Sequence, residues 1–266
     1  MGVVNVTPDS FSDGGAWFTP EAAAAHGREL VAQGADLLDV GGESTRPGAE
    51  RPTTAEELRR VLPVVEALSG LAPVSVDTMR ADVAAAALDA GAALVNDVSG
   101  GLADPEMLPL VAQRAVPFIA MHWRGHSREM QQRAHYDDVV GDVVRELGDR
   151  VEALAAAGVH PDAVLLDPGF GFAKNAEHNW QLLRRLDEVV ALGHRVVVGT
   201  SRKTFLGSVG RTGATARPPL ERDVATAVTT VHAARHGVWC VRVHDVVATV
   251  DALDVVEALH GFGGAP

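Results

Sequence analysis

Cysteine is almost absent from this sequence, because Cys240 is the only one among its 266 residues. A single thiol cannot form an internal disulfide, and the paired cysteines of a structural zinc site are missing as well. Cys240 stands in the apolar stretch GVWCVRV, where we expect it to be a small buried side chain. A disulfide-stapled fold and a cysteine-based zinc site are therefore excluded.

Positive charge is also scarce. The formal net charge is −12, from 23 lysine and arginine residues against 35 aspartate and glutamate residues. This balance argues against a surface that binds nucleic acid or an anionic membrane. An anionic ligand would have to be held by a local cluster of cations or by a metal ion. Hydrophobic residues make up 47% of the chain, which is enough for a packed core.

Long apolar runs are missing too. No run approaches the roughly 18 residues of a membrane span, and no secretion-signal pattern is present, so we expect a cytoplasmic protein. The sequence also contains no P-loop, no HExxH pattern and no GxSxG nucleophile elbow. His122, in MHWRG, has no second histidine at metal-binding spacing, and we expect it to be a hydrogen-bonded residue near a strand end.

Short apolar runs alternate with alanine-rich helical stretches along the whole chain. The expected strands are 2–5, 36–40, 73–76, 93–96, 117–121, 163–166, 195–199 and 238–242. The expected helices are 20–33, 54–69, 80–90, 105–114, 137–157, 177–190, 220–236 and 244–260. Helix 54–69 begins with Thr54 and carries Glu57 three residues later, the pattern of a capping box. Eight β/α pairs predict an α/β fold of the (β/α)8 TIM-barrel type, with residues 1–266 as a single domain. A doubly wound open sheet is the alternative.

Polar residues end several of the expected strands. VVNVTP leads to Asn5, PVSVDT to Asp77, ALVNDVSG to Asn96 and AVLLDPGFGF to Asp167. In a TIM barrel such positions meet at the carboxyl ends of the strands, where the active site lies. Two carboxylates and an amide suit a flat heterocycle rich in hydrogen-bond donors, such as a pterin or guanine. The alternative is that each acid only caps the following helix or turn.

Three potential cations follow the last two strands. Lys203 lies in GTSRKTFLG, and Arg242 and His244 lie in VRVHDV, where barrels often bind phosphate. Together they would bind a diphosphate despite the negative net charge of the chain. The alternatives are that Lys203 is a solvated side chain and that His244 only caps a helix. The loops 7–15 and 41–49 are rich in glycine, serine and proline and are predicted to be lids, with ordinary turns as the alternative.

Taken together, these motifs resemble the dihydropteroate synthase family. The resemblance rests on MGVVNVTPDSFSDGG, DVGGESTRPGA, VSVDT, LVNDVSGG, LLDPGFGFAK, GTSRK and VRVHDV, in order from residue 1 to about residue 255. It implies a transferase that condenses 6-hydroxymethyl-7,8-dihydropterin diphosphate with p-aminobenzoate, giving 7,8-dihydropteroate and pyrophosphate. The stretches MHWRG and AEHNW are similar to those of actinobacterial members.

The resemblance also implies roles for particular residues. Those expected around the pterin are Asp77, Asn96, Asp167, Lys203, Met121 and Phe172. Those expected around the diphosphate are Arg242, His244, Thr45 and Arg46, beside a Mg2+ ion held by Asn5. Those expected around the aminobenzoate are Phe11, Pro47, Ser201 and Lys203.

The implied reaction is dissociative and uses no strong nucleophile of the protein. The diphosphate leaves first, and the arylamine then captures a pterin methylene cation. Catalysis would be electrostatic, with cations on the leaving group and carboxylates near the pterin cation. The residues expected to act catalytically are Asp13, Lys203, Arg242 and His244.

Two other functions stay open at this point. A pterin-binding methyltransferase barrel would share the pterin-binding acids and amide but would not need the STRPG and TSRK stretches. A non-catalytic pterin-binding relative would keep the fold without needing the catalytic residues.

The resemblance further implies a homodimer formed through helices near the C-terminus, with no nucleic acid or membrane partner. Family members usually carry more residues before Asn5, so we expect either a shortened first strand that holds Asn5 less firmly or a natural start further upstream.

Overall fold

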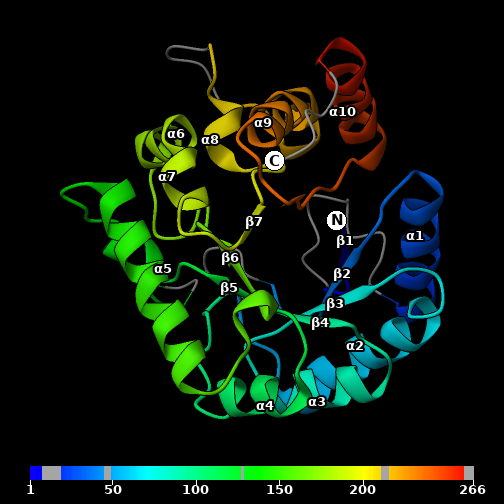
Figure 1. Ribbon diagram of the computed structural model, residues 1–266. Coiled ribbons are helices and arrows are strands. Elements are labelled where there is room, and N and C mark those ends of the chain that lie inside the picture. The colour runs from blue at the N-terminus through cyan, green and yellow to red at the C-terminus, as the bar shows by residue number, and fades with distance from the viewer. Residues whose placement is uncertain (8–18, 45–48, 127–128, 211–215, 261–266) are drawn as a thin grey trace.

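A sheet of eight parallel strands forms the centre of the computed structural model, which describes residues 1–7, 19–44, 49–126, 129–210 and 216–260 (Figure 1). The strands are β1 Gly2–Asn5, β2 Leu38–Gly41, β3 Val74–Asp77, β4 Leu94–Asp97, β5 Phe118–Met121, β6 Val164–Asp167, β7 Arg195–Val198 and β8 Cys240–Val241. Each strand pairs with the next one along the chain, so their order in the sheet is sequential. A doubly wound sheet would reverse this order at one point, so that alternative is wrong.

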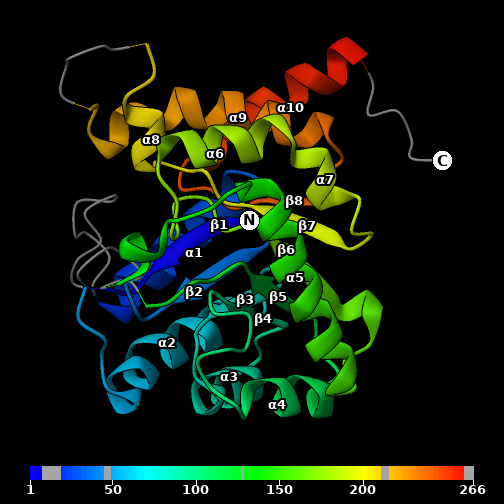
Figure 2. The ribbon, with the colours of Figure 1, turned by 90° about the vertical axis from the view of Figure 1, so that its left-hand side faces the viewer.

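Helices surround the sheet, as a parallel sheet with apolar side chains on both faces requires (Figures 1 and 2). The helices are α1 Pro20–Ala32, α2 Thr54–Leu68, α3 Ala81–Asp89, α4 Met107–Arg114, α5 Val139–Ala156, α6 Ala176–Arg184, α7 Leu186–Val190, α8 Thr204–Gly207, α9 Asp223–Arg235 and α10 Val246–His260. Three short 3-10 segments are η1 Met130–Arg133, η2 Pro161–Ala163 and η3 Pro219–Arg222. Among the helices in the described ranges, none has the length and apolar character needed to span a bilayer.

The expected helix 177–190 is in fact two helices. Arg185 has φ −119° and ψ 34°, which ends α6 and separates it from α7. Leu182, Leu186 and Val189 are all buried, so the apolar spacing of one helix continues across the break. Because periodicity is unchanged there, the sequence pattern could not reveal the interruption. The short helix α8 was also not predicted.

The cap of α2 lies one residue earlier than expected. The Thr53 hydroxyl accepts a hydrogen bond from the backbone N–H of Glu56 at 3.2 Å, so Thr53 is the cap rather than Thr54. Glu57, expected to complete a capping box with Thr54, is instead fully buried and accepts a hydrogen bond from Thr78 at 2.6 Å. Two overlapping Thr-x-x-Glu patterns occur here, and the burial of Glu57 decides between them.

Apolar side chains pack on both faces of the sheet. The larger cluster lies between the sheet and the helices, and a smaller inner cluster consists of Met1, Leu37, Leu94, Ile119, Leu165 and Val197. Because successive strand residues point to opposite faces, Leu165 joins the inner cluster while Leu166 joins the outer one. Cys240, expected to be buried, is only half-buried; it packs against the inner cluster, and desolvation raises the pKa of its thiol.

Backbone hydrogen bonds also connect β1 with the residue that follows β8. The N–H of Val3 donates to the carbonyl of Val243 at 3.0 Å, and the N–H of Val243 donates to the carbonyl of Met1 at 2.9 Å. Gly2 and Val243 form an isolated parallel bridge. The first strand therefore lies beside the last one, and it spans residues 2–5 as expected.

Candidate active site

The register of the sheet places polar strand ends at one level. Asn5 pairs with Gly41, Gly41 pairs with Asp77, and Asp77 pairs with Asn96 across neighbouring strands. Asp167 ends β6 on the other side of the same mouth. Asn5, Asp77, Asn96 and Asp167 all line one cavity of about 800 Å³. Residues far apart in the sequence are therefore brought to a single opening at the carboxyl ends of the strands.

Other residues singled out from the sequence also line this cavity. They are Met121, Phe172, Ser201, Lys203, Arg242 and His244. Five further predicted residues lie outside the described residues: Phe11, Asp13, Thr45, Arg46 and Pro47. The structure thus brings together every predicted site residue that it describes. The roles of these residues toward a substrate stay predictions.

Asp39, on β2, is a member of the site that sequence analysis missed. Its side chain is fully buried, and its Oδ2 accepts hydrogen bonds from Nδ2 of Asn96 at 3.1 Å and from Nε of Arg242 at 2.6 Å. Because the amide nitrogen of Asn96 is turned toward Asp39, its carbonyl oxygen is the acceptor that it can present to a ligand. One carboxylate thus orients two neighbouring polar groups.

Arg242 joins this carboxylate to a second one. Its Nη2 donates to Oδ2 of Asp77 at 3.0 Å, so the guanidinium lies between Asp39 and Asp77. Burial, followed by the charge of Asp39, raises the pKa of Asp77. Burial would lower the pKa of Arg242, but the two carboxylates outweigh that effect and raise it. Arg242 was predicted to contact a diphosphate; these contacts occupy two of its five N–H groups.

Asp167 and Lys203 occupy the opposite wall of the cavity. Oδ1 of Asp167 accepts a hydrogen bond from the N–H of Gly169 at 2.7 Å, and burial raises its pKa against the opposing charge of Lys203. The ammonium of Lys203 donates to the carbonyl of Phe170 and lies 4.7 Å from the centre of the Phe172 ring. Burial lowers the pKa of Lys203 to about 8. A carboxylate, an ammonium and an aromatic face therefore meet there.

Ser201 and His244 form a hydrogen-bonded pair at the ends of β7 and β8. The backbone N–H of His244 donates to Oγ of Ser201 at 3.1 Å, and Oγ lies 2.9 Å from Nδ1 of the same histidine. A hydroxyl can both donate and accept, so Oγ of Ser201 can bond the His244 ring as well as its backbone N–H. Groups predicted for the diphosphate and the aminobenzoate are thus adjacent.

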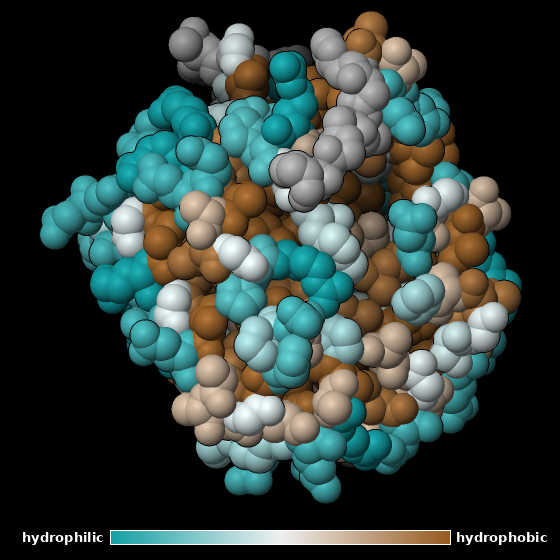
Figure 3. Space-filling view, in the orientation of Figure 1, coloured by the Kyte–Doolittle hydropathy of each residue, from teal (hydrophilic) through white to brown (hydrophobic). Residues whose placement is uncertain are grey.

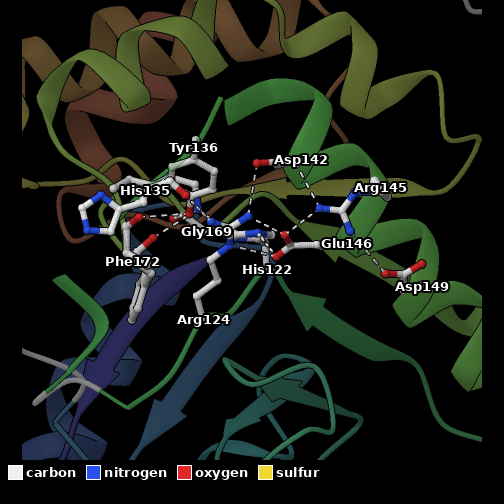
Figure 4. A network of polar contacts seen from close by, with 12 residues as sticks. His122, Arg124, His135, Tyr136, Asp142, Arg145, Glu146, Asp149, Gly169 and Phe172 are labelled. Carbon is white, nitrogen blue, oxygen red and sulfur yellow. Dashed lines mark hydrogen bonds and ion pairs between the residues drawn. The ribbon is translucent and has the colours of Figure 1, made fainter. Parts of the chain in front are cut away.

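A second polar network lies beside the cavity (Figure 4). His122 follows β5, and its Nε2 lies 3.0 Å from Oε2 of Glu146 on α5, which also accepts from Nε of Arg124 at 3.0 Å. The Nδ1 of His122 lies 2.9 Å from Nζ of Lys174, a residue that sequence analysis missed. The expectation that His122 is a hydrogen-bonded residue near a strand end is confirmed.

The geometry is that of an enzyme site for a small charged ligand, and comparison with known proteins defines the class. Residues 1–244 match the family described as pterin binding enzymes. A dihydropteroate synthase of Mycobacterium leprae is 54% identical over 97% of this chain and 92% of its own length. One of Synechocystis is 43% identical over 97% of this chain and 89% of its own length.

Solved structures give the same result. The Xanthomonas albilineans dihydropteroate synthase with 4-aminobenzoic acid superposes with a TM-score of 0.89, at 46% identity, covering 100% of this chain and 93% of that chain. The Yersinia pestis enzyme in a sulfonamide drug complex gives a TM-score of 0.91 at 42% identity, covering 97% and 93%. The chain belongs to the dihydropteroate synthase family of pterin-binding enzymes.

Proposed function

We propose that this chain condenses 6-hydroxymethyl-7,8-dihydropterin diphosphate with p-aminobenzoate to give 7,8-dihydropteroate and pyrophosphate. The bond between the pterin methylene carbon and the diphosphate oxygen breaks, a carbon–nitrogen bond forms, and the arylamine loses a proton. The observation that carries the proposal is that Asp77, Asn96 and Asp167 line one cavity of about 800 Å³ with Lys203 and Arg242. Membership of the dihydropteroate synthase family supports the same reaction.

The pterin ring is held by the acids and the amide. Carboxylates of Asp77 and Asp167 accept hydrogen bonds from the donor-rich edge of the ring, and the carbonyl of Asn96 accepts another. Met121 and Phe172, which also line the cavity, pack against the ring faces. Lys203, between Asp167 and the Phe172 ring, donates to a ring acceptor.

Catalysis is electrostatic and follows a dissociative course. Negative charge grows on the departing diphosphate, which Arg242, His244 and Lys203 stabilise. Positive charge grows on the pterin methylene carbon, which the nearby carboxylates of the pterin site stabilise. Charged groups that are fixed before the reaction starts lower the barrier without rearranging during it. Asp13, outside the described residues, is included in the proposal as a further carboxylate near the cation.

Asn5 is proposed to supply one oxygen ligand to Mg2+. Its half-buried side chain ends β1 and lines the cavity. Among the residues that the structure describes, no three or more His, Cys, Asp or Glu side chains form a group that could hold a metal ion. The amide oxygen of Asn5 is a hard oxygen donor of the kind that Mg2+ prefers, and it would hold the ion beside the leaving group. When bound, the ion offsets the charge of the leaving group.

The aminobenzoate is proposed to bind beside the diphosphate. Ser201 and Lys203 line this part of the cavity. Phe11 and Pro47 are proposed to enclose the benzene ring, with Thr45 and Arg46 near the diphosphate, and these four lie outside the described residues.

The eight strands are further proposed to close into a (β/α)8 barrel, with residues 1–266 forming one domain. Sequential strand order supports closure, as do the hydrogen bonds between Val3, Val243 and Met1 that connect β1 with the residue after β8. In closed barrels of this type the active site lies at the carboxyl ends of the strands, where the cavity is found.

A homodimer through α9 and α10 is also proposed. These helices lie side by side in both ribbon views, and apolar surface reaches the outside over α10 at the upper right of Figure 3. Val224 and Val228 of α9 are 77% and 66% exposed, and Val255 and Leu259 of α10 are 57% and 69% exposed. Each pair is spaced i, i+4, which places its members on one helix face. Exposed apolar side chains gathered in this way are typical of a protein–protein contact.

One coupled assay tests the proposed reaction. Purified protein is given the pterin diphosphate with Mg2+, and pyrophosphate release is followed with and without p-aminobenzoate. Release that depends on p-aminobenzoate and yields dihydropteroate is the expected result. Binding of the pterin without release would indicate a non-catalytic pterin-binding protein. Absence of both binding and release would contradict the proposal, and methyl transfer to or from a pterin would indicate a methyltransferase.

A further inference from the structure

Lysine is nearly absent from this chain, and both of its lysines lie at the cavity. Of the 23 lysine and arginine residues, only Lys174 and Lys203 are lysines, and both line the cavity. Lys174 is 3% exposed. A lysine ammonium is a compact group with three donors that can lose its proton, whereas an arginine guanidinium is planar and always charged. Because the chain uses arginine at every other Lys/Arg position except Lys203, we infer that position 174 requires an ammonium rather than a guanidinium.

The contacts of Lys174 match those properties. Its Nζ lies 3.1 Å from the carbonyl of Gly169, 3.1 Å from the carbonyl of Phe172 and 2.9 Å from Nδ1 of His122. Three acceptors therefore meet the three donors of one ammonium. Because Nδ1 of His122 accepts, its ring proton lies on Nε2 and is donated to Glu146 at 3.0 Å. The histidine is neutral in this arrangement, and burial followed by the charge of Lys174 lowers its pKa to about 4.

The loop between β6 and α6 is held by side chains through its carbonyls. The donors are Lys174 to Gly169 and Phe172, Lys203 to Phe170, Gln131 to Gly171, and Tyr136 to Ala173. Gly169, Gly171 and Ala173 have φ values of 68°, 78° and 47°, so the backbone here is not in a regular conformation. A loop of this shape depends on its side-chain donors, and Lys174 supplies two of the five bonds.

We propose that Lys174 is a positioning residue for the pterin. The Lys174 ammonium, which also donates to His122, holds the β6–α6 loop so that Asp167 and Phe172 face the substrate. It acts through the loop backbone. Lys174 binds the carbonyl of Gly169, and the N–H of Gly169 donates to Asp167 at 2.7 Å. The other carbonyl belongs to Phe172, whose ring faces Lys203. This inference rests on the proposed pterin function.

The protonation of Lys174 lies within reach of ordinary pH. Burial lowers the pKa of Lys174 to about 7, against the opposing charge of Asp167. A neutral amine has two donors and cannot satisfy all three acceptors. The charged and titratable groups facing it from the surrounding elements are Asp167, Lys203, Arg124, Glu146, His122, Tyr136 and His178.

Stability and pterin affinity should then respond to pH in opposite directions. Between pH 7 and the ordinary lysine pKa of 10.5, the folded state holds fewer protons than the unfolded state at Lys174. Its contribution to the stability of the fold therefore increases as pH rises through this range. Pterin affinity should fall over the same range, because the loop loses the ammonium. Lys203, whose pKa is about 8, contributes to the same fall, so the part due to Lys174 is measured from its own resonance and from the Lys174→Met variant.

Nuclear magnetic resonance on the wild-type protein gives the first test. Lysine labelled with 13C at Cε yields two signals, because the chain has two lysines, and the Lys203→Arg variant assigns them. We expect the Lys174 signal to titrate near pH 7 in the free protein. Binding of the pterin diphosphate should raise the titration midpoint of Lys174 by at least about half a pH unit. A ligand that binds more tightly when Lys174 is charged also makes Lys174 harder to deprotonate. An unchanged midpoint would overturn the inference.

Calorimetric titration of two variants gives the second test. Lys174→Met should weaken pterin diphosphate binding by about tenfold or more at pH 6, because carbonyls of the loop lose a charged donor. The difference from wild type should shrink toward pH 9. Tyr136→Phe is the matched control, because it removes a neutral donor to the same loop, and it should retain the pH profile of the wild type.

The outcomes separate this inference from the proposed function. If the wild type binds the pterin diphosphate and Lys174→Met shows the same affinity and pH profile, the positioning role fails while the reaction stands. If the wild type does not bind the pterin diphosphate, both fail. Should Lys174→Met not fold, the wild-type resonance titration still decides.

Discussion

Arg242 and Asp39 form an ion pair across the mouth of the sheet, with Nε of the arginine 2.6 Å from Oδ2 of the aspartate, although they are 203 positions apart in the sequence. The same oxygen accepts a hydrogen bond from Asn96. Arg242 in turn donates to Asp77. One buried carboxylate therefore fixes the orientation of a guanidinium and an amide that are both proposed to contact substrate.

Replacing Asp39 with asparagine should weaken pterin diphosphate binding and destabilise the fold. Asparagine keeps the shape but loses the charge that holds Arg242, whose half-buried guanidinium then has only Asp77 as a carboxylate partner among these contacts. Loss of one member of a buried ion pair lowers the free energy of unfolding by roughly 3 kcal/mol. We expect pterin affinity to fall by about tenfold or more, because the guanidinium and the Asn96 amide are no longer fixed. Urea unfolding and calorimetry measure the two effects.

Asp36→Asn is the matched control for this change. Asp36 is exposed just before β2, so the same substitution there should alter neither quantity appreciably. Wild-type affinity in Asp39→Asn, or an equal loss in both variants, would show that Asp39 does not position the site.

Replacing Asp167 with alanine should remove most of the pterin affinity. The change leaves ring donors of the bound pterin without a charged acceptor, which reduces binding by roughly 2–4 kcal/mol. Calorimetry with the pterin diphosphate measures the loss directly. Asp187→Ala, at an exposed position of α7, serves as the control and should bind like the wild type. Undiminished binding by Asp167→Ala would exclude this carboxylate from the pterin site.

Much of the fold could be predicted from the sequence. Each strand is a short apolar run between turn residues, and all eight lie within two residues of the expected ranges. The break at Arg185 could not be predicted, because the buried positions Leu182 and Leu186 keep helical spacing through it. The choice between Thr53 and Thr54 as a cap also depended on a tertiary contact, the burial of Glu57 against Thr78.

From spacing alone, the site was predictable where polar residues end a strand or follow the last two strands, as Lys203, Arg242 and His244 do. Asp77, Asn96 and Asp167 follow apolar runs directly, and parallel strands bring such ends together. Asp39 lies inside β2, and its partner Arg242 comes from the far end of the chain, so no local pattern connects them. Lys174 was missed for a different reason.

The amino-acid composition indicated that Lys174 is unusual, although the spacing of residues did not. The lysine follows a glycine-rich turn, and its acceptors come from the β5 end and from the loop backbone, neither of which a periodic pattern encodes. The scarcity of lysine in an arginine-rich chain, however, marks Lys174 and Lys203 as unusual from the sequence alone. A residue type that is rare in a chain is informative where it does occur.

Acid should destabilise the protein in part through His122. Burial, followed by the charge of Lys174, lowers the pKa of His122 from 6.5 to about 4. The folded state therefore resists protonation, so this contribution to stability is complete above pH 6.5 and is lost as pH falls toward 4. The shift corresponds to about 3 kcal/mol of unfolding free energy. Urea unfolding at several pH values between 4 and 7 measures it.

The His122→Gln variant isolates this contribution. Glutamine can accept a hydrogen bond from Lys174 and donate one to Glu146, as the neutral imidazole does, but it does not titrate. The acid-dependent loss of stability should therefore be smaller in the variant by about the same 3 kcal/mol. His160→Gln, at an exposed position, should leave the wild-type curve unchanged. Parallel curves for the wild type and His122→Gln would show that His122 is not responsible.

Val228→Asp should convert the proposed dimer into a monomer, as measured by light scattering. Val228 is 66% exposed on α9, so the charge adds little strain to the monomer but would be buried in the contact. Activity should fall as well, because loss of the contact would leave α9 and its first residue, Asp223, less firmly held. The Asp223 carboxylate accepts a hydrogen bond from Nε of Arg202 at 2.7 Å, and Arg202 lies between Ser201 and Lys203 in the sequence. Leu102→Asp, at an equally apolar exposed position after β4, should change neither mass nor activity. A monomeric wild type would refute the dimer, and an unchanged mass in Val228→Asp would place the contact elsewhere.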